Sequence, residues 1–410
     1  MKYLLAVSGS IASFKSYDVA RQLVKNGHEV KVVLTQGALE FIKPETFRYL
    51  GVQDVFLPTD DFVPANLDQK ENVLHVELAK WAQKLIIAPA SANTMARLSL
   101  GLNNDLLGSL YLAYGKKPVL FFPAMNTEMW NHPRTQEHLT ALKHLSHVAV
   151  VNPVSGLLAC GDIGQGKFPD VSAVVDLIET LDPLKKSGKK IVVTAGATVS
   201  PLDPVRYLTN PSSGKMGVAI AKAFLEAGHE VTVLAGYQCT PQVENLLGHP
   251  AFQLVKTPTT KQMRDAAMVH FPKADLYIST GAIADVEFDI ATEKIKKESM
   301  GSSLPFRQGP DILKDILGLK KAHQKVISFA AETQTTEEVF REKMKRKPVD
   351  LMIGNRVSSG ILGEETLTGF QVDEGQYYFV ESTRTTGPIP LKKIGLGHKL
   401  SQWFDGKTTW

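Results

Sequence analysis

Two nearly identical phrases constrain the fold of this chain more than any other feature of its sequence. "GHEVKVVLTQG" begins at Gly27, and "GHEVTVLAG" begins at Gly228 in the other half of the chain. Each phrase follows a helix-like run (Ser16–Asn26 and Gly217–Ala227), which itself follows an apolar stretch and a loop of small residues. Strand, loop, helix, glycine and strand is the order of a βαβ unit, in which the glycine suits the left-handed position that ends a helix. Because the two copies diverge soon afterwards, they predict two separate parallel-sheet domains and not a solenoid.

The remainder of each half alternates strand-like with helix-like segments, which predicts an α/β fold with two doubly wound domains. Strands are expected at Tyr3–Val7, Val30–Leu34, Lys84–Ala88, Pro118–Phe122 and His147–Pro153, and then at Ile191–Thr194, Val231–Leu234, Leu276–Thr280, Val326–Ala330 and Leu351–Ile353. The polar, turn-forming segment Asp182–Lys190 is the expected linker, so that the domains span 1–188 and 189–410. Residues 368–391 alternate apolar and polar side chains around Asp373–Gly375, which predicts a β-hairpin followed by a closing helix at 392–404.

Composition narrows the class of protein. The net charge is only +4 and there is no long basic run, which argues against a nucleic acid or an anionic membrane as partner. The first apolar run, Tyr3–Val7, is too short for a signal peptide, and no run approaches the ~20 apolar residues of a membrane span. Two cysteines, Cys160 and Cys239, cannot form a disulfide framework. We therefore expect a cytoplasmic protein.

Small-residue loops after strands are the first candidate sites. Gly9 lets backbone N–H groups approach a ligand closely, Ser10 offers a hydroxyl, and a helix N-terminus follows, a combination that suits a phosphate. A second loop of this kind, 88–94, contains Ser91. The pattern is not GxGxxG, so a mononucleotide is favoured over a dinucleotide. A plain tight turn explains the first loop equally well when it is taken alone.

Three further residues of the first half carry side chains suited to catalysis. Asn126 directly follows a strand, and its amide can donate a hydrogen bond to a carboxylate. Cys160 lies in a glycine-rich segment, 156–167, that is typical of a lid over a site. His75 is harder to interpret, since a lone histidine is more often a surface or core residue than a catalytic one.

The second half has one loop that favours anions. Asn210, Ser212, Ser213, Gly214 and Lys215 stand immediately before a helix, although an ordinary capping loop has the same composition. A cluster of lysines follows later in the chain, and such clusters most often form a solvated face. Its members are Lys294, Lys296 and Lys297.

Taken in order, the motifs carry a resemblance to a known family. "SGSIAS", "HVELAKWA", "PASANT", "PAMNTEMW" and "LACGDIGQG" closely resemble the homo-oligomeric flavin-containing cysteine decarboxylases. The whole chain is similar to the bifunctional family of coenzyme A biosynthesis, in which phosphopantothenoylcysteine decarboxylase is joined to phosphopantothenate–cysteine ligase. The resemblance implies a flavodoxin-like or Rossmann-like flavoprotein domain followed by a Rossmann-like ligase domain with the added hairpin.

For the first half, the resemblance implies FMN as cofactor. It also implies that His75 acts at the flavin and the substrate thiol, that Asn126 holds the substrate carboxylate, and that Cys160 donates a proton. The residues expected to bind FMN are Gly9, Ser10, Ala12, Thr35, Ser91 and Asn93.

For the second half, the resemblance implies that 4′-phosphopantothenate, cysteine and CTP are substrates and that Mg²⁺ assists, with metal ligands unknown. Asn210 and Lys294 are the expected catalytic residues, Asn210 in carrying the acyl-nucleotide intermediate forward. The expected nucleotide site comprises Asp285, Lys294, Gly309, Pro310, Asp311, Ile312, Phe329, Lys343 and Lys347.

The resemblance further implies a homo-oligomer, with trimeric contacts in the first half and dimeric contacts in the second. Two alternatives remain at this point. One is a non-catalytic FMN-binding regulatory subunit, against which the joint presence of His75, Asn126 and Cys160 argues. The other is a decarboxylase with an inactive second half, against which Asn210 and Lys294 argue.

Overall fold

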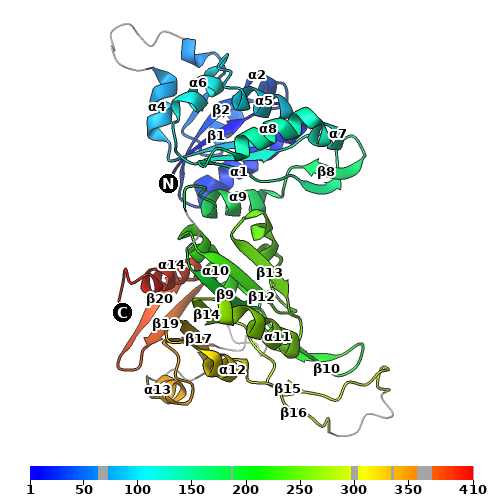
Figure 1. Cartoon of the computed structure of the whole chain (residues 1–410), viewed down its shortest axis with the longest axis vertical. Coiled ribbons are helices and arrows are strands. Elements are labelled where there is room, and N and C mark those ends of the chain that lie inside the picture. The colour runs from blue at the N-terminus through cyan, green and yellow to red at the C-terminus, as the bar shows by residue number, and fades with distance from the viewer. Residues whose placement is uncertain (63–72, 186–187, 297–302, 334–336, 358–371, 410) are drawn as a thin grey trace. The chain divides into compact units, whose positions relative to one another are not determined.

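The chain forms two compact units, which are described separately here. A computed structural model describes residues 1–62, 73–185, 188–296, 303–333, 337–357 and 372–409, and its backbone contacts divide the chain into Met1–Lys186 and Ser187–Trp410 (Figure 1). The expected linker includes residues 186 and 187, which lie outside the described residues. In the described ranges, none of the helices combines the length and the apolar character that crossing a membrane requires.

The first unit is built on a six-stranded parallel sheet with the strand order β3-β2-β1-β4-β5-β6. The strands are β1 (Lys2–Val7), β2 (Glu29–Leu34), β3 (Asp54–Phe56), β4 (Lys84–Ala90), β5 (Val119–Pro123) and β6 (Val148–Val150). The helices are α1 (Lys15–Lys25), α2 (Gln36–Leu39), α3 (Pro44–Tyr49), α4 (Leu74–Trp81), α5 (Ala92–Ser99), α6 (Leu106–Ala113), α7 (Thr127–Asn131), α8 (Pro133–Lys143) and α9 (Val171–Thr180). This strand order is that of a doubly wound nucleotide-binding fold.

Apolar side chains cover both faces of this sheet, which explains why its central strands are continuous apolar runs. One core cluster joins alternate residues of β1 and β2 to α1 and α9. The other cluster joins the opposite faces of β1 and β4 to α4, α5, α6 and α8. Every residue of β4 is buried, including Lys84, whose ammonium group donates to the carbonyl oxygens of Ile178 and Leu181 at the end of α9.

The second unit repeats the same order, and two antiparallel strands extend it: β13-β12-β9-β14-β17-β18-β19-β20. Its strands are β9 (Lys190–Ala195), β12 (Glu230–Ala235), β13 (Phe252–Lys256), β14 (Leu276–Ser279), β17 (Lys325–Glu332), β18 (Leu351–Arg356), β19 (Glu374–Val380) and β20 (Thr385–Lys392). Helices α10 (Lys215–Glu226) and α14 (Lys393–Phe404) cover one face, and α11 (Thr260–His270), α12 (Ile312–Leu319) and α13 (Glu337–Arg346) cover the other. The expected α/β class with two doubly wound sheets is confirmed.

Two short ribbons extend from the second sheet, and a third belongs to the first unit. The second unit carries β10 (Val199–Pro201) paired with β11 (Tyr207–Thr209), and β15 (Val286–Glu287) paired with β16 (Arg307–Gln308). The first unit carries β7 (Val154–Leu157) paired with β8 (Ile163–Lys167). The remaining elements are the short 3₁₀ helices η1 (Ile11–Phe14), η2 (Asp60–Phe62), η3 (Pro241–Gly248) and η4 (Phe271–Lys273).

The C-terminal hairpin is present, but its turn lies elsewhere than the sequence suggested. The expected turn at Asp373–Gly375 lies at the start of β19, where Gly375 pairs with Leu391. The chain instead turns between β19 and β20, where the N–H of Glu381 donates to the carbonyl oxygen of Arg384 at 2.8 Å. Glu374 and Gly375 are held extended by their pairing with Lys392 and Leu391 of β20, and this pairing overrides the local turn composition.

Candidate active sites

Serine side chains tie together the loops at the carboxyl edge of the first sheet. The buried hydroxyl of Ser8, at the end of β1, donates to the carbonyl oxygen of Pro89 at 2.8 Å and accepts from the N–H of Ser91 at 2.8 Å. The hydroxyl of Ser10 donates to the carbonyl oxygen of Ala124, which follows β5, at 3.1 Å. Ligands of open parallel sheets bind at this edge. The loops after β1, β4 and β5 therefore form one connected platform.

Backbone groups approach one another closely on this platform. A Cβ atom added to Gly9 would lie 2.9 Å from the backbone of Gly37, in the first turn of α2, which follows β2. Ser91 caps α5 by accepting from the N–H of Thr94 at 3.2 Å, so the N-terminus of this helix lies at the carboxyl edge of β4. These features fit a phosphate-bearing cofactor, because a phosphate needs close backbone donors and a helix N-terminus. Of the residues expected at FMN, Gly9, Ser10 and Ala12 lie before or within η1, Thr35 precedes α2, and Ser91 and Asn93 begin α5.

The structure brings Asn126 and Cys160 together. Asn126 caps α7, because its Oδ1 accepts from the N–H of Glu128 at 2.8 Å. Its Nδ2 donates to the Sγ of Cys160 at 3.3 Å, and that thiol donates to the carboxylate of Asp162 at 3.2 Å. An amide and a thiol thus meet at the carboxyl edge, although they are far apart in the sequence.

The glycine-rich segment around Cys160 is a hairpin, β7–β8, and not an irregular loop. Its base packs on the start of α7, since the N–H of Met125 donates to the carbonyl oxygen of Gly166 and a Cβ added to Gly166 would lie 2.2 Å from the carbonyl oxygen of Met125. Its tip is exposed, with Leu157 and Ile163 64% and 84% accessible on paired positions. A ribbon with an anchored base and an apolar, exposed tip can cover a ligand at Asn126.

His75 occupies the first turn of α4 and contacts a different partner. Its Nδ1 lies 2.8 Å from Oδ1 of Asp61 in η2. In the part of the chain that the structure describes, no hydrogen bond joins His75 to Asn126 or Cys160.

In the second unit, threonine side chains tie the loops at the corresponding edge. Thr198, after β9, shares a hydrogen bond with Thr260 at 2.9 Å, and its hydroxyl accepts from the N–H of Ala284, after β14, at 2.8 Å. The Nδ2 of Asn210 donates to the carbonyl oxygen of Ile283 in the same loop at 2.9 Å. This bond holds the candidate catalytic amide at the carboxyl ends of β9 and β14.

A pocket of about 610 Å³ adjoins Asn210, and its lining includes Ser212, Ser213, Lys215 and Cys239. Gly214, which caps α10, has a φ of +75°, a backbone conformation that glycine adopts without strain. Burial raises the pKa of the Cys239 thiol to about 11, so this cysteine is neutral at pH 7. The pocket therefore offers hydroxyls, a lysine and a helix N-terminus to an anion, but no thiolate nucleophile.

Two side chains that the sequence did not indicate hold the segment next to Lys294. The buried carboxylate of Asp203 accepts from the N–H of Ile295 at 3.2 Å, and the guanidinium of Arg206 donates to the carbonyl oxygen of the same residue at 2.5 Å. Asp203 and Arg206 also form an ion pair at 2.7 Å. Lys294 itself is exposed. Of the two other lysines of its cluster, Lys296 is also exposed, and Lys297 lies outside the described residues.

The other residues expected at the nucleotide fall into linked groups. The N–H of Gly309 donates to the carbonyl oxygen of Asp285 at 2.8 Å, and Asp311 caps α12 and pairs with Lys347 at 2.7 Å. Lys343 pairs with Glu332 at the end of β17. Pro310, Ile312 and Phe329 lie beside these residues in sequence, on the same loop, helix and strand. Two expected lysines are therefore paired with carboxylates.

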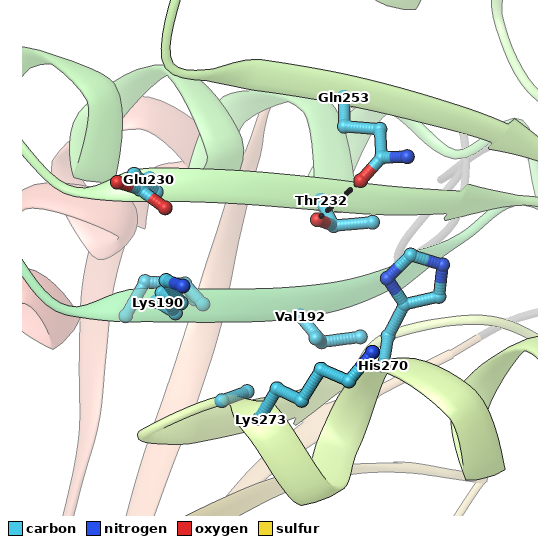
Figure 2. A pocket seen from close by; sticks show the side chains of 9 residues that line it. Lys190, Val192, Glu230, Thr232, Gln253, His270 and Lys273 are labelled. Carbon is cyan, nitrogen blue, oxygen red and sulfur yellow. Dashed lines mark hydrogen bonds between the residues drawn. The ribbon is translucent and has the colours of Figure 1, made fainter.

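A separate pocket of about 270 Å³ lies at the opposite end of the strands (Figure 2). Lys190 and Glu230, the first residues of β9 and β12, line it together with His270 and Lys273, and Thr232 donates to Gln253 at 3.4 Å. Because ligands of open parallel sheets bind at the carboxyl ends, this pocket is not a candidate for the nucleotide.

Comparisons with known proteins agree with this division of the chain. The family model "Flavoprotein" matches residues 1–181, and the model "DNA/pantothenate metabolism flavoprotein C-terminal domain" matches residues 186–404. The chain is 35% identical to the coenzyme A biosynthesis bifunctional protein CoaBC of Bacillus subtilis, over 88% of this chain and 87% of that protein. It is 34% identical to the CoaBC protein of Mycobacterium bovis, over 94% and 91% of the two chains.

A solved structure also resembles the first unit. A PPC decarboxylase complexed with pantothenoylaminoethenethiol is 34% identical and covers 43% of this chain and 95% of its own, with a TM-score of 0.40. The family assignment rests on the sequence matches and not on this structural similarity. The two family models and the CoaBC proteins match both halves of the chain, which confirms the resemblance that its motifs carry. The chain therefore belongs to the bifunctional proteins of coenzyme A biosynthesis, which join a flavoprotein decarboxylase to a ligase.

Proposed function

We propose that the second unit joins 4′-phosphopantothenate to cysteine with CTP, and that the first unit decarboxylates the resulting 4′-phosphopantothenoylcysteine to 4′-phosphopantetheine with FMN. The observation that carries the proposal is the contact between Asn126, which caps α7, and Cys160, in the turn of the β7–β8 hairpin. It supports the proposal because the amide of Asn126, the proposed donor to the substrate carboxylate, lies beside the thiol of Cys160, the proposed proton donor, at the carboxyl edge of the first sheet.

In the first unit, each candidate residue has a separate task. FMN, when bound, would accept a hydride as the substrate thiol is oxidised to a thioaldehyde, whose C=S group is the electron sink for the loss of CO₂, and would return that hydride to the enethiol. His75 accepts the proton of the substrate thiol, and the amide of Asn126 donates to the carboxylate that is lost as CO₂. Cys160 then gives its proton to the carbon of the enethiol. Closure of the hairpin over these groups keeps water from competing for the proton. The platform residues Gly9, Ser10, Ala12, Thr35, Ser91 and Asn93 are the proposed FMN ligands.

In the second unit, the substrate carboxylate must first acquire a good leaving group. It attacks the α-phosphate of CTP and releases diphosphate, and the amine of cysteine then displaces CMP from the acyl-cytidylate. Lys294, Lys343 and Lys347 spread the charge of the triphosphate, together with Mg²⁺. Within the described residues, no three His, Cys, Asp or Glu side chains are placed to hold a metal ion, so the proposed Mg²⁺ would be held largely by the triphosphate. Asn210 assists the attack of the amine.

The assembly is proposed from the family alone. We propose a homo-oligomer, with trimeric contacts through the first unit and dimeric contacts through the second. Location in the cytoplasm also stays a prediction from the sequence.

The full chain, reconstituted with FMN, provides the test. Incubation with 4′-phosphopantothenate, cysteine, Mg²⁺ and CTP should yield 4′-phosphopantetheine, detected by mass spectrometry, and omission of CTP should abolish it. Supplying 4′-phosphopantothenoylcysteine directly should remove the need for CTP. A regulatory subunit would give no product in either reaction. A decarboxylase with an inactive second half would act only on the preformed intermediate, and either result would contradict the proposal.

A further inference from the structure

The carboxylate of Asp61 contacts two nitrogen atoms of His75, the ring Nδ1 and the backbone N. Asp61 lies in η2, and its Oδ1 and Oδ2 are 2.8 and 2.9 Å from Nδ1 of His75. The same carboxylate accepts from the backbone N–H of His75 at 3.2 Å. The side chain of Asp61 is only 6% exposed, whereas that of His75 is 26% exposed. The imidazole of His75 is therefore partly exposed to solvent, while its Nδ1 is hydrogen-bonded to the buried carboxylate of Asp61.

We propose that Asp61 is a positioning residue that fixes the tautomer and the orientation of His75. An ionised carboxylate can only accept hydrogen bonds, so the nitrogen that faces it, Nδ1, must carry a proton. In the neutral imidazole, Nε2 then has a lone pair and is the atom that can accept the proton of the substrate thiol. This inference rests on the proposed function, in which His75 accepts that proton.

The burial of Asp61 supports this reading. A carboxylate removed from water is costly unless donors replace the lost hydration. Among the described residues, the donors to Asp61 are the ring and the backbone N–H of His75, so the carboxylate fixes the orientation of the imidazole. The neighbouring Asp60 is arranged differently: its carboxylate accepts from the N–H of Leu57 at 2.8 Å, and no hydrogen bond to His75 is found for it in the described chain.

Asp61 also has a structural task, which the test must separate from positioning. It accepts from an N–H in the first turn of α4, where helix N–H groups lack partners within the helix and a negative charge is favourable. Asp61→Asn keeps the shape of the side chain and an oxygen that can accept from that N–H. Its amide can, however, donate to Nδ1 and so favour the opposite tautomer, with the proton on Nε2. Asp60→Asn is the matched control, since it removes the same charge one residue away.

The test uses the full chain reconstituted with flavin and mixed anaerobically with 4′-phosphopantothenoylcysteine. We expect Asp61→Asn to keep the flavin content and melting temperature and to change KM by less than about threefold. The rate of flavin bleaching should fall by about 100-fold or more, the scale at which general acid–base groups act. Asp60→Asn should bleach the flavin at the wild-type rate. Equal losses in both variants would overturn the proposal.

A second readout does not depend on activity. In flavin-free chain labelled with nitrogen-15 at its 11 histidines, the signals missing from His75→Asn identify His75. They should show a protonated Nδ1 in the wild type and a protonated Nε2 in Asp61→Asn, and an unchanged tautomer in the variant would overturn the proposal. If Asp61→Asn loses flavin, the tautomer of His75 is measured in Asp61→Glu instead. This variant keeps a carboxylate, so the proposal requires a protonated Nδ1 in it. His75→Asn bleaching at the normal rate would refute instead the proposed role of His75.

Discussion

Replacing Gly9 by alanine tests whether the platform of the first unit binds the flavin. The added Cβ would lie 2.9 Å from the Cα, C and O atoms of Gly37, whereas ordinary contacts begin at 3.4 Å. The obstacle is backbone in the first turn of α2, which cannot rotate away as a side chain could. Relief therefore requires the two loops to separate by about half an ångström, and overpacking of this kind costs about 1–3 kcal/mol.

This cost predicts the size of the effect on cofactor binding. If the separated loops are the ones that must close on the flavin, affinity for FMN should fall roughly 5- to 150-fold, since each 1.4 kcal/mol is a factor of ten. The measurement is a titration of flavin-free protein with FMN, followed by the quenching of flavin fluorescence, together with the melting temperature of each sample.

Two other glycines provide controls of graded severity. A Cβ on Gly37 would lie 3.2 Å from the Cα of Gly9, so Gly37→Ala should weaken FMN binding less. Gly395, in α14 of the second unit, has no atom within 4 Å of an added Cβ, so Gly395→Ala should leave FMN binding unchanged and raise stability by about 0.5–1 kcal/mol. An affinity for FMN in Gly9→Ala equal to that of the wild type, or higher than that of Gly37→Ala, would refute the reasoning.

Three further predictions concern the proposed chemistry and the acid sensitivity of the ligase unit. Cys160→Ser should stop decarboxylation after CO₂ loss and accumulate the enethiol, seen by mass spectrometry; normal turnover would contradict its role. Lys294→Gln should slow diphosphate release, whereas Asn210→Asp should release diphosphate and accumulate acyl-cytidylate until cysteine is added; equal slowing in both would refute this division. Burial disfavours the charge of Asp203, yet three backbone N–H groups and Arg206 lower its pKa to about 2 from an ordinary value of 3.8. The ionised Asp203 therefore stabilises the fold fully above pH 3.8, and this contribution is lost as pH falls toward 2. The drop in melting temperature on acidification should be smaller in Asp203→Asn than in the wild type. An equal drop in both proteins would contradict this role of Asp203.

The central strands of the two sheets were predictable from the sequence because they are buried on both faces, whereas the less buried edge strands β3 and β13 were not predicted. A segment such as β4, with every residue buried, must be an apolar run, and the run is visible in the sequence. The C-terminal turn was misplaced for the complementary reason. Asp373–Gly375 has the composition of a turn, but Glu374 and Gly375 pair with Lys392 and Leu391 of β20, and local composition carries no record of this pairing.

The partners of the candidate residues could not be predicted in the same way. Asp61 lies 14 positions before His75, and Asp203 lies 92 positions before Ile295, so no periodicity links the members of either pair. A motif places a residue at the carboxyl edge of a strand, because that position depends on local order alone. Its hydrogen-bond partner depends on which loops the strand order brings together. Asn126 and Cys160 were thus expected individually, and their contact followed only from the folded β7–β8 hairpin.

The two units show how little the sheet itself decides about chemistry. Both parallel sheets have the same strand order, and both tie their loops at the carboxyl edge through hydroxyl groups, serines in one and threonines in the other. The difference lies in what is inserted at that edge. The first unit adds a hairpin that carries a thiol, whereas the second adds the β10–β11 and β15–β16 ribbons and lysines that are paired with Glu332 and Asp311. In the proposed nucleotide site, a triphosphate would compete with those carboxylates for Lys343 and Lys347, so we expect nucleotide binding to be coupled to a rearrangement of these two ion pairs. Fold and function are separable here, because a common sheet positions two unrelated sets of side chains.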